Sequence, residues 1–358
     1  MPRAGISYGI LTTQNQGGGV KKQGLPPNIG KNQFNFRLIK RKAYPSKQPE
    51  AEAEAGCPEK IVPVPFGTQY TSNASLEIFR GCTKIIGSLR ISGSFQPTFS
   101  IFDCLEEITG SFYIESNTSL TSISGFGALK SVGTFFYIND NSSLTSISGF
   151  GRLRTVGTSS SHSFNIGFNA SLTSVSGFEN LLTISGFFSI NDNPSLTGVS
   201  GFGNLTSIGE YFGINQNTLL TNISGFGNLL TVGGYFQIAV NASITSISGF
   251  GNLTSVGGAV FQIINNTLLT NISGFESFQT VGGNFLITSN GTTASPIANN
   301  VVTTVTGFGN LTVPNGITGD LTLQGISSIR LLGIASAIVT NLTAATTGTV
   351  NTTNLYTA

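Results

Sequence analysis

The stretch LLTVGGYFQIAVNASITSISGFGN, residues 229–252, decides the fold, because close copies of it follow one another along most of the chain. In each copy an Asn stands three residues after the Ile of a Phe-x-Ile-like segment, and these Asn residues are separated by 24, 28, 24, 24, 24, 25 and 24 positions. They are Asn117, Asn141, Asn169, Asn193, Asn217, Asn241, Asn266 and Asn290. A fixed period of this length is the signature of a solenoid of stacked coils. Together with degenerate copies around Leu89 and Leu321, it predicts about ten coils.

Within one coil the residue pattern predicts β-strand rather than helix. Phe236 and Ile238 alternate with their neighbours, which is the period of a strand with one buried face. Gly and Asn recur too often for an α-helix of useful length. Because one coil cannot bury its own apolar edge, equivalent Leu, Ile, Val and Phe residues must stack about 4.8 Å apart to form a core. We therefore expect an all-β solenoid over residues 56–330, an extended arm over 1–55 and a C-terminal cap or tail over 331–358.

Charge is divided unevenly between these parts. Residues 1–50 hold nine of the 17 basic residues and one acidic residue, a net charge of +8, whereas the remaining chain has eight basic and fourteen acidic residues and a net charge of −6. Such an arm can bind capsid proteins, nucleic acid, an anionic membrane or another polyanion, and a solubilising or assembly tail is the alternative. No apolar run approaches the roughly 20 residues of a membrane-spanning helix. No hydrophobic segment follows Met1, so we expect no secretory signal peptide.

The repeated Asn and Gly residues have structural interpretations. An inward Asn amide can bond the backbone of its own turn and of the neighbouring coil, where the strand ladder is interrupted. Gly in Val-Gly-Gly and Ser-Gly-Phe allows dihedrals that a Cβ would obstruct. The many N-x-[ST] sequons suggest a glycoprotein, but an inward position excludes a glycan from four of them, at Asn117, Asn141, Asn169 and Asn241. Four others are freer: Asn204, Asn222, Asn252 and Asn271.

Residues suited to catalysis or metal binding are scarce, since charged residues make up 9% of the chain and there is one His. His162 lies among serines in an insertion, without a nucleophile elbow or a nearby acid, so we expect a solvated loop tip. Glu106 and Glu107 are adjacent, which on a strand sends them to opposite faces. The Gly-rich runs lack the Gly-Lys-[Ser/Thr] of a phosphate loop, and no Cys/His cluster favours zinc. We expect no catalytic residue, no metal and no cofactor.

The segments GCPEKIVPV (residues 56–64) and LEIFRGCTKIIGSLRIS (76–92), with the repeats that follow, resemble the receptor L-domain family. That family is a right-handed β-helix related to leucine-rich repeats, and the repeats look most like its fungal wall-anchored members. The resemblance implies a disulfide between Cys57 and Cys82, with two free thiols as the alternative, and it favours an oxidising location. Cys104 is expected to be a small buried apolar residue.

A second resemblance concerns the arm. Its segment SYGILTTQNQGGGVKKQGLPPNIG, residues 7–30, is similar to the N-termini of proteins encoded by large DNA viruses of algae. This likeness implies a location in the virion, and the receptor L-domain likeness implies an extracellular or cell-surface one.

The outward side of the Phe-x-Ile strands is the candidate binding surface. If Phe136 and Ile138 point inward, their neighbours point outward and form a face of aromatic rings and amides with almost no charge. Its residues are Tyr113, Phe135, Tyr137, Asn139, Phe187, Asn191, Tyr211, Asn215, Tyr235 and Gln237. Rings stack on sugars or anchor proteins, and amides orient a ligand. The alternative is a ladder that stabilises the sheet itself or packs between subunits. Loops 158–163 and 291–302 interrupt the repeat, and we expect them to flank a binding face.

These features favour a non-enzymatic recognition or adhesion protein that binds host glycan or protein through the solenoid, with the arm as a tether in a virion. A purely structural capsid component and a cellular wall or surface protein are the alternatives. A polysaccharide-cleaving β-helix is disfavoured, because the strands carry neither clustered acids nor a basic catalytic residue.

Overall fold

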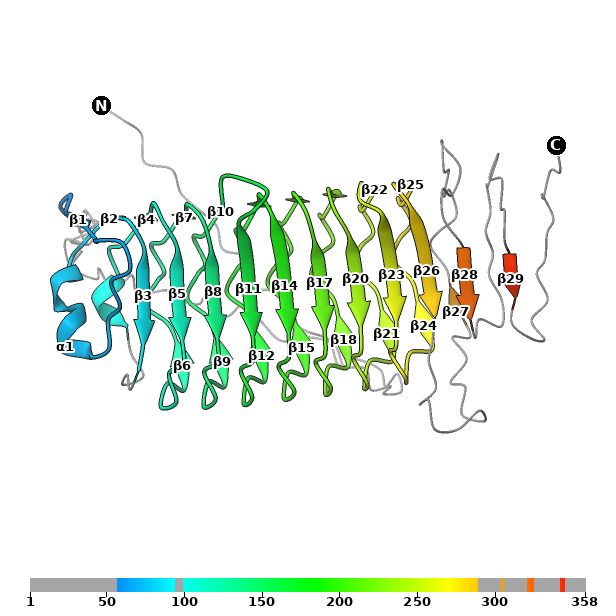
Figure 1. Ribbon diagram of the computed structural model, residues 1–358, viewed down its shortest axis with the longest axis horizontal. Helices are drawn as coiled ribbons and strands as arrows, with labels where there is room; N and C mark the ends of the chain where they lie inside the picture. Colours follow the sequence, from blue (N-terminus) through cyan, green and yellow to red (C-terminus); the bar gives the residue numbers. More distant parts are fainter. Residues whose placement is uncertain (1–56, 94–98, 289–303, 306–320, 325–341, 345–358) are drawn as a thin grey trace, which may run out of the picture. The chain divides into compact units, whose positions relative to one another are not determined.

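The computed structural model describes residues 57–93, 99–288, 304–305, 321–324 and 342–344, and these form an all-β solenoid (Figure 1). The expected fold is confirmed, with about nine coils of about 24 residues rather than ten. Helix is limited, in this part of the chain, to α1 (Asn73–Leu76) and the 3₁₀ turns η1 (Glu77–Phe79) and η2 (Ser100–Phe102). The predicted arm lies outside the described residues, as does the predicted C-terminal region except for residues 342–344.

The described strands form three parallel sheets, named here A, B and C. Sheet A runs in the order β1 (Ile61–Pro63), β2 (Lys84–Ile86), β4 (Glu107–Ile108), β7 (Ser131–Val132), β10 (Thr155–Val156), β13 (Thr183–Ile184), β16 (Ser207–Ile208), β19 (Thr231–Val232), β22 (Ser255–Val256) and β25 (Thr280–Val281). Sheet C runs through β6 (Ser122–Ile123), β9 (Ser146–Ile147), β12 (Ser174–Val175), β15 (Gly198–Val199), β18 (Asn222–Ile223), β21 (Ser246–Ile247), β24 (Asn271–Ile272) and β27 (Thr304–Val305).

Sheet B is built from the longest strands, the Phe-x-Ile segments. It runs through β3 (Leu89–Ser92), β5 (Phe112–Glu115), β8 (Phe136–Asn139), β11 (Ser163–Gly167), β14 (Phe187–Asn191), β17 (Phe212–Asn215), β20 (Phe236–Ala239), β23 (Val260–Ile264), β26 (Asn284–Thr288), β28 (Leu321–Gln324) and β29 (Leu342–Ala344). Each strand pairs in parallel with its equivalent one coil away, so that Phe212 lies beside Phe236 and Ile214 beside Ile238. Equivalent residues therefore form columns along the solenoid.

Two columns of Phe fill the centre of the core. One comes from the Phe-x-Ile strands and the other from Ser-Gly-Phe, and the side chains are buried. Within a column the rings stack, as in Phe226 and Phe250, whose centroids are 5.4 Å apart with an interplanar angle of 3°. Between columns they meet edge to face, as in Phe212 and Phe226 at 5.1 Å and 89°. Each buried Phe stabilises the fold by about 1.5–3 kcal/mol relative to an exposed one.

The Asn column has the predicted inward position. Asn193 Oδ1 accepts two hydrogen bonds from Asn169: one from the backbone N–H at 3.1 Å and one from the side-chain Nδ2 at 3.2 Å. Its own Nδ2 donates to the carbonyl oxygens of Ile166 and Asn191, at 3.1 and 3.0 Å. The same buried position is held by Asn117, Asn141, Asn169, Asn193, Asn217, Asn241 and Asn266. A glycan cannot fit at the sequons of this column. Asn290 lies outside the described residues.

The two kinds of repeated Gly are required for different reasons. In Ser-Gly-Phe the backbone is left-handed, with φ of 90° at Gly225. Gly209, which follows sheet A strand β16, is instead a point of close approach between coils, because a Cβ there would lie 1.9 Å from the carbonyl oxygen of Ser185. The prediction that Gly is needed for its backbone dihedrals is therefore right for Ser-Gly-Phe and wrong for Gly209.

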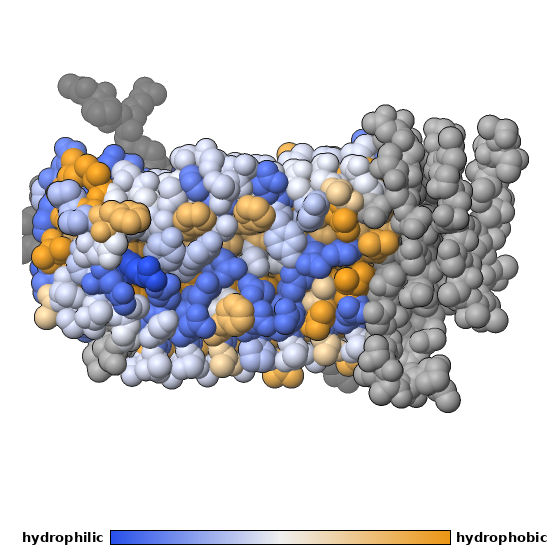
Figure 2. Space-filling model, viewed as in Figure 1, coloured by the Kyte–Doolittle hydropathy of each residue, from blue (hydrophilic) through white to orange (hydrophobic). Residues whose placement is uncertain are grey.

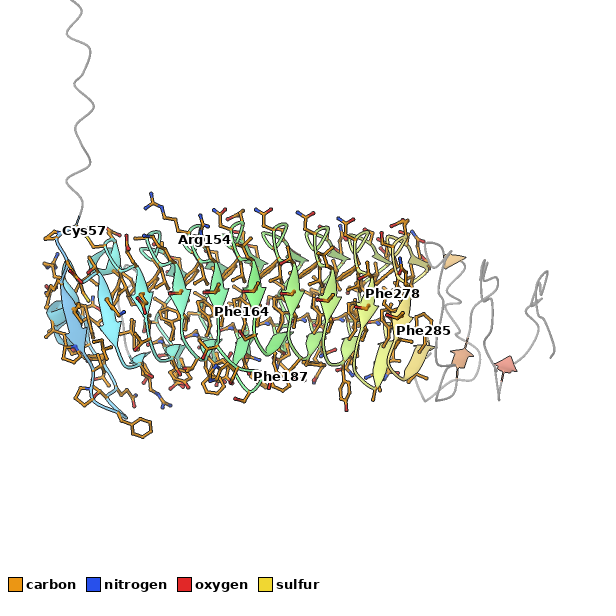
Figure 3. All side chains as sticks on the ribbon, turned by 90° about the horizontal axis from the view of Figure 1, so that it is seen from above. Cys57, Arg154, Phe164, Phe187, Phe278 and Phe285 are labelled. Carbon is orange, nitrogen blue, oxygen red and sulfur yellow. A yellow bond between two sulfur atoms is a disulfide. The ribbon has the colours of Figure 1, made fainter. Side chains whose placement is uncertain are left out.

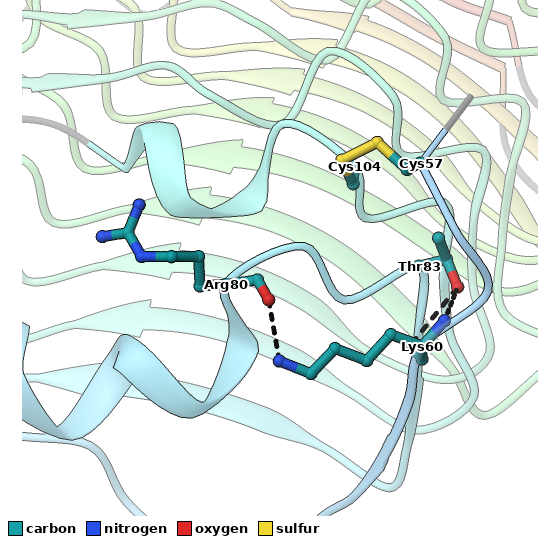
Figure 4. Close-up of a disulfide and its surroundings, with 5 residues drawn as sticks. All are labelled: Cys57, Lys60, Arg80, Thr83 and Cys104. Carbon is teal, nitrogen blue, oxygen red and sulfur yellow. Dashed lines mark hydrogen bonds between the residues drawn. A yellow bond between two sulfur atoms is a disulfide. The ribbon is translucent and has the colours of Figure 1, made fainter. Parts of the chain in front are cut away.

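The cysteine pairing differs from the expected one. Cys57 is bonded to Cys104, with their Cα atoms 5.7 Å apart (Figure 4). Cys82 is a free, buried thiol. The register of sheet A explains this: Lys84 pairs with Glu107, so Cys82 occupies the inward column that Leu105 fills in the next coil. The disulfide between Cys57 and Cys82 and the buried apolar role of Cys104 were both wrong. Lys60 also holds the segment after Cys57 in place. Its backbone forms hydrogen bonds with Thr83, and its Nζ donates one of 2.7 Å to the Arg80 carbonyl oxygen.

We expect Asn193→Ala to lower the free energy of unfolding by about 3 kcal/mol or more, since it leaves several buried donors and acceptors of neighbouring coils unpaired. Asn204→Ala is the matched control: Asn204 is exposed, and its Nδ2 donates a single bond of 2.6 Å to the Glu179 carbonyl oxygen. Urea denaturation followed by circular dichroism measures both. Equal losses in the two variants would contradict the role assigned to the inward column.

Peptide mapping without reduction should recover Cys57 joined to Cys104, and Cys82 should react with iodoacetamide only after unfolding. Burial raises the pKa of the Cys82 thiol, which keeps it protonated and unreactive. The Cys57–Cys104 disulfide closes a loop with a sequence separation of 47, which stabilises the fold by about 4 kcal/mol in the chain-entropy model. Cys104→Ser should therefore lower the free energy of unfolding of the first coils. A Cys57–Cys82 peptide in the native protein would refute the pairing.

Candidate recognition surface

The structure brings the predicted surface residues together on the outer side of sheet B. The strand register places them in three columns that run along the solenoid. The first column contains Phe135, Ser163, Phe187, Tyr211 and Tyr235; the second contains Arg90, Tyr113, Tyr137, Asn165, Ser189, Gly213, Gln237 and Gln262; the third contains Glu115, Asn139, Gly167, Asn191, Asn215 and Ala239. Figure 3 shows Phe187 on the outside and Phe164 within the stack. Figure 2 shows this face as a largely hydrophilic or neutral surface with separate apolar spots.

The rings of the first coils pack against one another. Tyr113 and Tyr137 meet edge to face with centroids 5.4 Å apart, and Phe135 lies 5.4 Å from Tyr137. The guanidinium of Arg90 lies 5.5 Å from the centre of the Tyr113 ring. All three rings are half-buried. Here the alternative interpretation, a ladder that stabilises the sheet, fits the contacts well.

His162 joins this cluster instead of standing as a solvated loop tip. Its ring contacts Phe135 edge to face at 5.4 Å. Its Nδ1 accepts the backbone N–H groups of Thr158 and Ser159, at 3.0 and 3.2 Å. The inserted loop is thus held against the edge of sheet B, and the imidazole has a structural role.

Tyr211 lies flat over the next residue of the sheet. A Cβ on Gly213 would be 2.2 Å from the Tyr211 hydroxyl oxygen, so the ring fills the place of a side chain there. The hydroxyl donates to Gln237 Oε1 at 2.6 Å and accepts from Asn215 Nδ2 at 2.7 Å. Burial raises the pKa of Tyr211, and the hydrogen bond from Asn215 opposes this. Three predicted surface residues therefore form one network.

The other amides are bonded within the sheet. Asn139 Oδ1 accepts the backbone N–H of Gly167 at 2.9 Å. Asn191 Oδ1 accepts from Asn165 Nδ2 and from Ser189 Oγ, both at 3.0 Å. Among the described residues, Asn165 Oδ1 and Asn215 Oδ1 are buried without a hydrogen-bond partner. The amides thus hold the surface in shape more than they reach toward a ligand.

Phe187 and Tyr235 are the exposed rings on the described part of this face, and the half-buried ring of Tyr211 lies between them, so that the three form an aromatic stripe. Phe187 is 38% exposed and Tyr235 is 51% exposed. Phe187 and Tyr211 have ring centroids 6.5 Å apart. The three residues stand on consecutive coils, so the stripe extends about 10 Å along the solenoid. None of the strands β14, β17 and β20 carries a charged residue.

Sheet B is also where the coils differ from one another. The outward column of sheet A contains only Ser and Thr after its first strands: Ser131, Thr155, Thr183, Ser207, Thr231, Ser255 and Thr280. The columns of sheet B change from ring to amide to glycine between neighbouring coils. The buried columns are nearly constant from coil to coil. Packing of the core therefore does not explain why the outward residues of sheet B vary.

The described residues offer little other chemistry. They hold no group of three or more His, Cys, Asp and Glu side chains that could bind a metal. Glu106 pairs with Lys130 at 2.7 Å and Glu107 with Lys84 at 2.9 Å, so each of these acids has a lysine partner. No helix in the described segments is both long and apolar enough to cross a membrane.

Comparison with known proteins supports the receptor L-domain resemblance over part of the chain. Residues 81–168 match the family model described as Receptor L domain. A leucine-rich repeat protein from Bacteroides ovatus is similar in structure, with 18% sequence identity over 76% of this chain and 82% of that chain, and a TM-score of 0.21. A search of curated proteins finds no match. The matched segment contains the ring cluster of Tyr113, Phe135 and Tyr137, and the aromatic stripe lies beyond it.

Two surface features were not found from the sequence. Asn165 was missed because the four-residue insertion before it shifts the repeat. A second, exposed Asn column was also missed; it includes Asn204 and Asn252, two of the four freer sequons, and its amides donate to the preceding coil, as in Asn252 to the Gly227 carbonyl oxygen at 2.7 Å. The spacing of 24 residues from Asn180 to Asn204, Asn228 and Asn252 was the available signal.

We expect Tyr211→Phe to lower the free energy of unfolding by about 1 kcal/mol, because Gln237 and Asn215 lose a shared partner. Since the folded-state pKa of Tyr211 is raised, its contribution is complete below about pH 10 and is lost as pH rises through the folded-state pKa. Urea unfolding of both proteins on either side of that pH measures the difference. The exposed Tyr235→Phe is the control and should change stability little. A difference that grows with pH would contradict the assigned network.

Proposed function

We propose that this protein is a non-enzymatic recognition or adhesion protein that binds a glycan or protein of a host through the outer side of sheet B. The observation that carries the proposal is the aromatic stripe on the face where the coils differ, in which Phe187 and Tyr235 are exposed on either side of Tyr211. Exposed rings beside an uncharged surface are the usual means by which proteins anchor sugars or partner proteins.

The chemistry of the stripe indicates an uncharged contact. Its strands carry no ionic side chain, and Tyr211 is held by Gln237 and Asn215 before any ligand arrives. A ring fixed in this way loses little conformational entropy on binding. The receptor L-domain match is consistent with this role, because receptor L domains bind proteins and are usually non-catalytic.

We also propose a virion-associated location, with the basic arm as tether. The support for it is the likeness of residues 7–30 to proteins of large algal viruses. Mass spectrometry of purified virions, with the solenoid peptides quantified against a known capsid protein, tests membership directly. Absence from purified particles would favour the cellular wall or surface alternative.

A structural role between coat proteins is the second candidate, and the packed rings of Tyr113, Phe135 and Tyr137 favour it. The two roles differ in what the stripe does. In a structural component the stripe is covered by neighbouring subunits, whereas in a recognition protein it remains open on the assembled particle. Surface labelling of tyrosine on intact particles separates them.

For the recognition role, we expect the double variant Phe187→Ala/Tyr235→Ala to lower affinity for glycans on an array, or for host surface proteins, at least tenfold. Loss of two anchoring rings commonly has an effect of this size. Leu230→Ala is the matched control, because Leu230 is 45% exposed and lies beside sheet A. Unchanged binding by the double variant would reject this surface.

A further inference from the structure

The chain leaves seven strands of sheet B, from β5 to β23, through a non-glycine residue with a left-handed backbone. These corner residues are Ser116, Asp140, Phe168, Asp192, Gln216, Val240 and Asn265, with φ between 54° and 59°. The Ser-Gly-Phe corners, where φ is also positive, use Gly throughout the regular coils. A non-Gly residue in this conformation costs roughly 1–2 kcal/mol. Asp140, Asp192 and Asn265 are residue types that tolerate this backbone. Phe168, Gln216 and Val240 are not, so the backbone geometry gives no reason for these three side chains.

Five of the seven corner side chains form one wall of an open groove of about 590 Å³. The wall consists of Asp140, Phe168, Asp192, Gln216 and Val240, and the remaining lining consists of Ala170, Pro194 and Thr218. The five corner residues come from consecutive coils, so the groove extends about 19 Å parallel to the solenoid axis. It runs along the edge of sheet B without including the aromatic stripe.

The lining combines apolar and hydrogen-bonding groups along its length. Phe168 is 53% exposed, and the register of the coils places it between Asp140 and Asp192. The Asp192 carboxylate accepts Asn191 Nδ2 at 2.8 Å and, like any carboxylate, has lone pairs for further donors. At the other end Val240 is 44% exposed. A fitting ligand thus has an apolar face bordered by hydrogen-bond donors.

We propose that this corner groove binds a neutral, unbranched oligosaccharide parallel to the solenoid axis, with one sugar ring against Phe168 and its hydroxyls donating to Asp140 and Asp192. A pyranose ring has an apolar face of C–H groups and a rim of hydroxyl donors, which is the required combination. None of the eight described lining residues is basic, so an anionic sugar is disfavoured. This inference rests on the proposed recognition role and assigns it a glycan at a site of its own.

A basic peptide is the competing ligand, since carboxylates also accept from Lys and Arg. The observations favour the glycan, because acidic residues border only Phe168 and the lining continues uncharged through Pro194, Gln216, Thr218 and Val240. A cation would use the acidic end alone. A sugar chain uses the whole length, because each further residue meets another coil.

The test is calorimetric titration of the full chain with cello-, manno- and chito-oligosaccharides of increasing length. We expect affinity for one series to rise with length until the groove is filled and then to level off. Phe168→Asn should weaken that binding at least tenfold while preserving the fold, since Asn tolerates the left-handed backbone. Phe168→Tyr should retain binding, and Asp140→Asn/Asp192→Asn should weaken it. Phe66→Ala, which removes a fully exposed ring elsewhere, is the control.

The outcomes separate this inference from the proposed function. Glycan binding lost in Phe187→Ala/Tyr235→Ala but kept in Phe168→Asn would overturn the groove and leave the recognition role intact. Binding of oligolysine that needs both Asp residues but not Phe168, without binding of any sugar, would overturn the glycan assignment. No binding of any of the three series would overturn it as well.

Discussion

The whole solenoid depends on pairing the backbone at corners that lie inside it. Where a strand ends and the chain turns, N–H and C=O groups lose their ladder partners, and burying them unpaired costs about 1–3 kcal/mol each. The inward Asn pairs these groups: the Asn193 amide accepts from the coil before it and donates to two carbonyl oxygens, and Asn141, Asn169 and Asn217 do the same. The bonds link each coil to the next, so the corner is stable only in the stack.

This dependence explains which positions are constant. Phe columns with rings about parallel require the same residue in each coil, and the close approach at Gly209 allows no Cβ. An insertion is tolerated only where it leaves the columns in register, as the loop held by His162 does. The repeat is thus maintained by contacts between neighbours, not by the strand propensity of any single coil.

The period and the alternation within Phe-x-Ile were sufficient to predict the solenoid, the inward Asn column and the outward side of sheet B. The predicted disulfide between Cys57 and Cys82 was wrong because it followed from the family resemblance, whereas the repeat indicates a buried position for Cys82. Aligning Cys82 with Leu105 and Leu129 would have placed it in the core column. The bonds of Tyr211 were beyond prediction, because they depend on a side chain folding into the space that Gly213 leaves empty. The corner groove was missed because Asp140 and Phe168 follow strand ends, where a loop residue is the ordinary interpretation.

Strand length is consistent with the proposed placement of recognition on sheet B. The regular strands of sheets A and C are two residues long and present a single outward column, whereas those of sheet B have four or five residues and present a wider surface. Away from its hydrogen-bonded residues, substitutions on the exposed part of this face usually change stability by no more than about 0.5 kcal/mol. Sheet B and the corner that follows it can therefore vary from coil to coil while the inward residues stay fixed. A repeated core thus supports a non-repeated surface, which a ligand can distinguish along its length.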